Sequence, residues 1–122
     1  GWPGRRLVGE DGAHAAWLLV QHASGAFQAE VLPLLLEAAE QGDARWDDAA
    51  MLQDRVLVFH EGKPQIYGSQ LRENTATGKL ELAPIQDEAR VDERRAEVRL
   101  QPLAEYLKGF GLTYEPPAAD PE

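Results

Sequence analysis

Polar side chains interrupt an apolar segment near the start of the chain. Gln21 and His22 stand seven and eight residues after His14, so all three share one stripe if this segment is a helix. The stripe fits either a functional surface or the solvent face of an amphipathic helix. Because the unperturbed pKa of histidine is about 6.5, His22 suits a general acid or base at neutral pH.

A carboxylate and a guanidinium stand next to each other in another expected helix. Asp54 falls between apolar residues on one helical face, where a carboxylate is either paired or has a raised pKa. Two interpretations are open. Asp54 orients His22 while Arg55 holds a substrate carboxylate, or Asp54 forms a structural ion pair with a helix neighbour, Arg94 or Arg95.

The segment Gln65–Gln70 concentrates hydrogen-bonding side chains within six residues. We expect a β-strand here, with Gln65, Tyr67 and Ser69 on one face. On the other face, Gly68 leaves room for a ligand or for a close backbone approach. The alternative is an edge strand that carries polar side chains without a ligand.

Helical periodicity and helix-ending glycines predict most of the elements that position these residues. The expected helices cover residues 12–23, 26–41, 47–59, 88–99 and 103–108. Pro33 predicts a kink or a late start of the second helix, and Asp47 or Asp48 is expected to cap the third. We expect the run Asp92–Arg95 to form a solvated helical face with local ion pairs.

Alternating patterns predict one β-hairpin, with strands over residues 65–72 and 79–83 and a loop at Asn74–Gly78. A two-stranded hairpin is marginal alone and must pack on helices. The expected fold class is mainly α (α+β), a compact bundle of four or five helices with one two-stranded β-hairpin. It forms a single globular domain over residues 1–115, after an irregular lead-in at residues 1–9, and ends in a disordered tail at 116–122.

The composition excludes several kinds of site. The chain has 122 residues, no cysteine, three histidines and a formal net charge of −9. Without cysteine it has no disulfide, no iron–sulfur cluster and no cysteine nucleophile. The histidines are scattered, and neither a phosphate-binding loop nor a nucleophile elbow is present, so we expect no metal and no cofactor.

The charge and hydropathy also bear on partners and location. An acidic chain is a poor binder of nucleic acid or anionic membranes, which favour clustered Lys and Arg. No apolar run approaches the ~20 residues of a membrane span. We therefore expect no nucleic acid and no membrane as partners, and a cytoplasmic location. The chain begins at Gly1 rather than at Met, so secretion of a processed form stays open.

Several stretches of the chain resemble one known family. They are Val8-Gly9-Glu10-Asp11-Gly12 with Gln21-His22-Ala23, then Leu52-x-Asp54-Arg55-Val56, then Gly62-x-Pro64-Gln65-x-Tyr67-Gly68-Ser69-Gln70, and finally Pro84-Ile85-x-Asp87 with Val91-Asp92-x-Arg94-Arg95. The chain resembles domain-of-unknown-function family 6624, whose members are small and mostly bacterial, and which usually carries Thr in place of Ser69. The resemblance implies no reaction, but it implies that these stretches recur together around one pocket.

The expected function follows from a cleft between the first helix, the third helix and the hairpin. We expect a small cofactor-independent acid–base enzyme that hydrolyses, eliminates or isomerises a small molecule or peptide. His22 and Asp54 are the expected catalytic residues. The expected substrate-binding residues are Gln21, Arg55, Tyr67, Ser69 and Gln70.

Two other interpretations use the same residues differently. In the first, the chain is a non-catalytic small-ligand or protein-binding domain whose polar cluster is a structural hydrogen-bond network. In the second, it is an immunity or regulatory protein that docks on a basic partner through its acidic surface.

Overall fold

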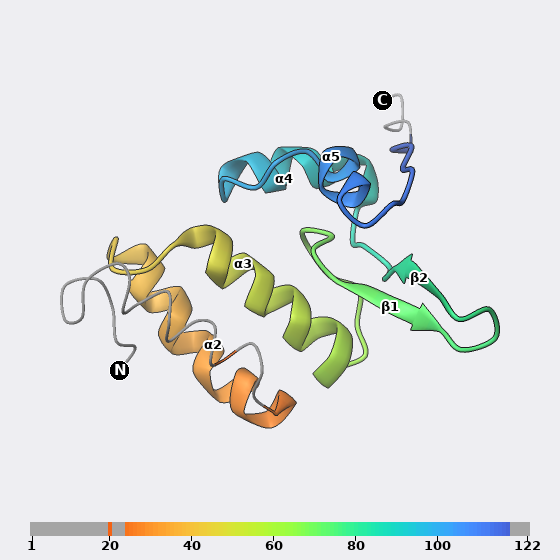
Figure 1. Cartoon of the computed structure of the whole chain (residues 1–122). Coiled ribbons are helices and arrows are strands. Elements are labelled where there is room, and N and C mark those ends of the chain that lie inside the picture. The colour runs from red at the N-terminus through yellow and green to blue at the C-terminus, as the bar shows by residue number, and fades with distance from the viewer. Residues whose placement is uncertain (1–19, 21–23, 118–122) are drawn as a thin grey trace.

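The computed structural model describes residues 20 and 24–117. Its first part is a pair of helices, α2 (Gly25–Glu40) and α3 (Trp46–Arg55), which run side by side in Figure 1. Leu35 of α2 and Ala49 and Leu52 of α3 are fully buried between them. The two helices thus close around an apolar core, as their periodicity predicts.

Helix α2 follows the expected second helix closely. The hydroxyl of Ser24 caps its first turn by accepting a hydrogen bond from the N–H of Phe27 at 3.3 Å. Pro33 lies inside the helix. Gly42, with a φ of +74°, provides the left-handed residue after its last turn.

Helix α3 begins earlier than expected, and the predicted caps are wrong. Its N-cap is Arg45, so Asp47 and Asp48 stand inside the first turn. There Asp47 binds the Arg45 guanidinium through both carboxylate oxygens, at 3.0 and 2.7 Å. A negative charge in this turn also favours the helix dipole. At its other end α3 continues into a π-helix, Val56–His60, where the sequence predicts only a soft boundary.

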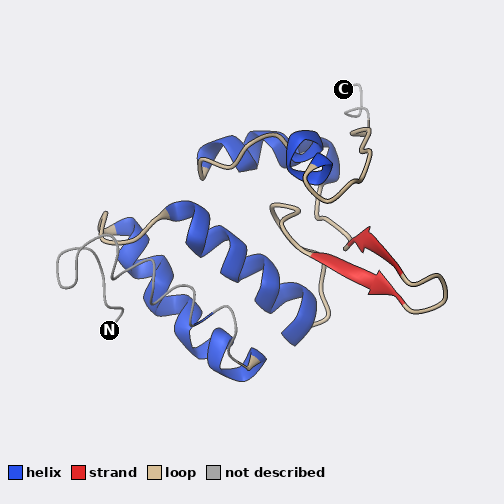
Figure 2. Cartoon of the chain, viewed as in Figure 1, coloured by secondary structure: helices blue, strands red, loops and turns tan. Residues whose placement is uncertain are grey.

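The second part combines a hairpin with two short helices (Figure 2). Strands β1 (Leu71–Asn74) and β2 (Lys79–Leu82) pair antiparallel, with Leu71 opposite Leu82. A 3-10 turn then leads into α4 (Val91–Glu97), and α5 (Leu103–Lys108) follows. Leu103 of α5 is fully buried, and Leu71 and Leu82 pack on its cluster. The mainly α fold with one small antiparallel hairpin is confirmed.

The predicted strand over residues 65–72 is wrong in its first six residues. Only its end belongs to β1, and Gln65–Gln70 is a loop between the π-helix and the hairpin. The N–H groups and carbonyls of Ile66, Tyr67 and Ser69 bond to side chains, as described below. The two end residues bond to backbone groups, Gln65 to those of Pro84 and Gln86 and Gln70 to that of Ala83. The predicted alternation of faces therefore does not apply to Tyr67 and Ser69.

Some predictions fall outside the described residues. These are the lead-in, residues 118–122 of the tail, and the first helix except Val20. Val20 is helical and buried, and its carbonyl accepts a hydrogen bond from Nε2 of the buried Gln28 at 3.1 Å. Within the described ranges, no helix has the length and apolar character needed to cross a membrane.

Gly68 offers a test of the loop conformation. Its φ is +71°, and an added Cβ would lie 3.0 Å from Cδ1 of Ile85 and 3.1 Å from Cδ1 of Leu103. Gly68→Ala combines a left-handed backbone cost with overpacking, so it should lower the free energy of unfolding by about 2–4 kcal/mol. Chemical denaturation would measure the loss.

Gly78→Ala is the matched control. Gly78 has a φ of +72° but no atom within 4 Å of its added Cβ, so only the backbone cost of about 1–2 kcal/mol remains. Equal losses in the two variants would show that the packing of Gly68 has no energetic role.

Candidate functional site

The candidate site is organised around the carboxylate of Asp54, which is 0% exposed. Its Oδ1 accepts hydrogen bonds from the backbone N–H groups of Ile66 at 2.8 Å and Tyr67 at 3.0 Å. Its Oδ2 accepts two more from Ser69, from the N–H at 3.0 Å and from the hydroxyl at 2.7 Å. The last turn of α3 thus holds the loop Gln65–Gln70 through four hydrogen bonds to one side chain.

Two buried glutamines close the ends of this loop. Gln65 donates from Nε2 to the carbonyls of Gln70 at 3.0 Å and Ala83 at 2.9 Å, and its Oε1 accepts from the N–H of Gln70 at 2.8 Å. Gln70 in turn donates from Nε2 to the hydroxyl of Ser69 at 3.0 Å. The side-chain amide of Gln65 therefore joins the two ends of the loop and connects them to Ala83.

The opposite face of the loop is bound by α4 and α5. The carbonyl of Ile66 accepts from Nε of Arg94 at 2.9 Å, and the carbonyl of Tyr67 accepts from Nη1 of Arg95 at 2.7 Å. The carbonyl of Ser69 accepts from the hydroxyl of Tyr106 at 2.8 Å.

The loop therefore forms hydrogen bonds on two sides, through the N–H groups of Ile66, Tyr67 and Ser69 on one side and through their carbonyls on the other. Asp54 takes the N–H groups, and α4 and α5 supply the donors for the carbonyls. We call this set of contacts the loop network. It consists of Asp54, Gln65, Ser69, Gln70, Arg94, Arg95 and Tyr106 with the backbone of residues 65–70.

Burial sets the ionisation of the groups around the loop. Burial raises the pKa of the Tyr106 hydroxyl above its ordinary value of 10.0, so it stays a donor at neutral pH. Burial also raises the pKa of Tyr67, with a smaller contribution from the charge of Asp54. The same desolvation lowers the pKa of Arg95, whose guanidinium lies 4.9 Å from the centre of the Tyr106 ring.

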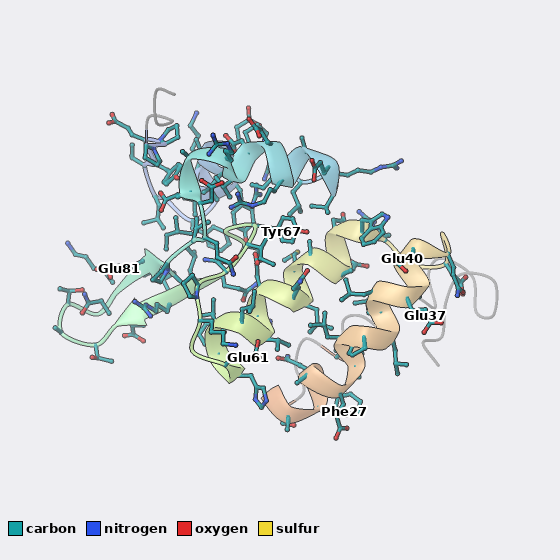
Figure 3. The ribbon with its side chains drawn as sticks, turned by 180° about the vertical axis from the view of Figure 1, so that it is seen from behind. Phe27, Glu37, Glu40, Glu61, Tyr67 and Glu81 are labelled. Carbon is teal, nitrogen blue, oxygen red and sulfur yellow. The ribbon has the colours of Figure 1, made fainter. Side chains whose placement is uncertain are left out.

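The structure brings four of the predicted site residues together. Asp54, Ser69 and Gln70 are buried, while Tyr67 is partly exposed. Figure 3 shows Tyr67 between α3 and α4. Arg55 follows Asp54 in α3 and is also partly exposed. Gln21 and His22 lie outside the described residues, so their position relative to Asp54 stays a prediction.

Four members of the loop network are not among the predicted site residues: Gln65, Arg94, Arg95 and Tyr106. Gln65 lies in the polar segment that the sequence singles out, but the strand pattern gave it no distinct role. Arg95 was expected on a solvated face and is instead 1% exposed, because it reaches under the loop to a backbone carbonyl. Tyr106 follows Leu103 by three residues on the buried face of α5, and nothing in its spacing indicates a hydroxyl contact.

The ion pair between Asp54 and Arg94 or Arg95, one of the two interpretations of this carboxylate, does not form. Both arginines bind carbonyls of the loop, and Asp54 binds its N–H groups. The loop thus lies between the carboxylate and the two guanidinium groups, and it supplies hydrogen-bond partners to all three. Across the part of the chain that the structure describes, no three His, Asp or Glu side chains are grouped as a metal site.

The fold and this network define a small helical domain in which one buried carboxylate fixes the loop that leads into a hairpin. The chain belongs to the family of unknown function DUF6624, whose profile matches residues 1–115. No curated protein and no solved structure matches it.

Substitution of Asp54 tests the energetic weight of the loop network. Asp54→Asn would place an amide NH2 against donors of the loop, so at least one N–H would lose its acceptor. We expect the free energy of unfolding to fall by about 2–4 kcal/mol. Urea denaturation followed by circular dichroism would measure it.

Glu37→Gln removes the same charge from an exposed position on α2. This control should change the stability by no more than about 0.5 kcal/mol. If Asp54→Asn were as stable as this control, or more stable than the wild type, the network would not be the main support of the loop.

Proposed function

We propose that the chain is a non-catalytic binding domain for a small ligand or a protein, and that its buried polar cluster is a structural hydrogen-bond network. The observation that carries this proposal is that hydrogen bonds from the loop occupy both carboxylate oxygens of Asp54. A general base or an orienting carboxylate needs an oxygen that can reach the reacting group or the catalytic histidine. Both oxygens of Asp54 already accept two hydrogen bonds each.

The burial of the neighbouring polar groups supports the same proposal. Ser69 and Gln70 are each 5% exposed, and both bond within the loop network. A substrate would have to displace internal hydrogen bonds to reach them, at a cost of about 1–3 kcal/mol for each group left unpaired. Polar groups that are satisfied in this way rigidify a fold and specify its geometry.

The acid–base enzyme is the second candidate, with His22 as the proton-transfer group. Two features of the described chain favour it. Tyr67 and Arg55 keep exposed surface beside Asp54, so two of the expected substrate-binding residues are accessible. In addition, the start of α2 lies against the π-helix that extends α3, since a Cβ at Gly25 would lie 3.3 Å from Nδ1 of His60. His22 stands three residues before Gly25 in the sequence.

A pH titration of the histidines by NMR separates the two candidates. The binding-domain proposal expects the pKa of His22 near its ordinary value of about 6.5. It also expects no change in that pKa in Asp54→Asn relative to the charge-matched Glu37→Gln, under conditions where the spectra show each variant folded. The wild-type value is informative even if Asp54→Asn unfolds.

The enzyme candidate expects a different pattern. A His22 pKa well away from its ordinary value, which moves when Asp54 loses its charge but not when Glu37 does, would establish a histidine–carboxylate pair. That result would overturn the proposal that Asp54 has only a structural role.

A further inference from the structure

A second polar region lies away from the loop network. A pocket of about 580 Å³ opens between the turn that joins α2 to α3 and Arg99, which lies two residues after the end of α4. Figures 1 and 3 both show the C-terminal end of α4 next to the start of α3. The volume of the pocket falls within the range of about 300–1,000 Å³ that is usual for small-ligand sites.

The pocket offers a flat apolar surface. Trp46, the first residue of α3, lines it and is 40% exposed. An indole ring favours stacking or edge contacts with another ring, and its N–H is a hydrogen-bond donor. This is the kind of side chain that holds a planar group of a ligand.

In the described part of the chain, two side chains of opposite charge also line the pocket without a partner. Arg45 and Asp47 bind each other at 2.7 Å, so they are already paired. Within the described residues, the side chains of Glu40 and Arg99 form no hydrogen bond or ion pair. Of the described residues that line the pocket, Arg99 is therefore an uncommitted cation and Glu40 an uncommitted anion.

The backbone holds Arg99 in an unusual conformation. Its φ is +63°, in the left-handed region where glycine is favoured. The N–H of Leu100 donates to the carbonyl of Arg95 at 2.8 Å, and the N–H of Arg99 donates to the carbonyl of Ala96 at 3.1 Å. This is the Schellman end of a helix, in which the left-handed residue is commonly Gly. A side chain retained at such a position is a reason to look for a function of that side chain.

We propose that this pocket binds a small zwitterion with a planar ring, such as an aromatic amino acid. Arg99 would hold its carboxylate, Glu40 its ammonium group, and Trp46 its ring. A guanidinium and a carboxylate are the natural partners of these two groups. The inference rests on the proposed binding function and gives it a site and a class of ligand.

NMR titration of the full-length 15N-labelled chain tests the proposal. The probes are phenylalanine, phenylpropionate, which lacks the ammonium group, and phenylethylamine, which lacks the carboxylate. The indole N–H signal of Trp46, assigned by its loss in Trp46→Phe, and the amides of Glu40 and Arg99 report on the pocket. We expect saturable shifts with phenylalanine, and binding at least about tenfold weaker for each probe that lacks one charge.

Two variants with matched controls tie the binding to these side chains. Arg99→Asn keeps a residue that tolerates positive φ and should weaken phenylalanine binding at least about tenfold, whereas Arg72→Asn, on the exposed strand β1, should not. Glu40→Gln should weaken it as well, and Glu37→Gln should not.

The absence of saturable shifts at the pocket, equal binding of phenylalanine and phenylpropionate, or unchanged binding by Arg99→Asn would overturn this inference. The proposed binding function would survive these results and is tested separately by the His22 titration.

Discussion

A carboxylate without contact to solvent is tolerated only when its hydrogen bonds are supplied by the protein. Asp54 obtains all of them from three residues that lie 12–15 positions further along the chain. This requirement bends residues 65–70 into a loop and turns the carbonyls of Ile66, Tyr67 and Ser69 towards α4 and α5. Arg94, Arg95 and Tyr106 complete the arrangement from that side. One buried charge thus links α3, the loop and the two last helices.

The same constraint reaches the proposed ligand pocket. Arg95 is fixed by the carbonyl of Tyr67, and its own carbonyl accepts the hydrogen bond that ends α4. The position of Arg99 at the pocket therefore depends on the loop network, although no residue of the network lines the pocket. In this account the loop network makes the fold rigid, and the proposed ligand-binding side chains of Glu40, Trp46 and Arg99 lie outside it.

Much of the fold could be predicted from the sequence because its causes are local. The spacing of apolar residues and the glycine at position 42 define α2, and Pro102 and Gly109 bracket α5 where the structure places it. The alternation in Lys79–Leu82 and the turn before it define the hairpin. In each case the signal lies within the element itself, and the family resemblance adds the grouping of Asp54 with Tyr67, Ser69 and Gln70.

The rest depends on contacts that no local pattern encodes. Gln65–Gln70 alternates like a strand, but the N–H groups of Ile66, Tyr67 and Ser69 bond to the side chain of Asp54 in α3. The run that contains Arg94 and Arg95 looks like an exposed face until the loop carbonyls are in place. Arg99 and Trp46 are 53 residues apart in the sequence, and neither belongs to a motif. A sequence reveals which polar residues are unusual more readily than what they bind.

Native-state amide hydrogen exchange tests the central claim most directly. If Asp54 anchors the loop, the N–H groups of Ile66, Tyr67 and Ser69 exchange only through large-scale unfolding and are as protected as those in the middle of α3. The amide of Thr77, in the exposed turn of the hairpin, provides the comparison. Exchange of the three loop amides at the rate of Thr77, in a folded chain, would contradict the account.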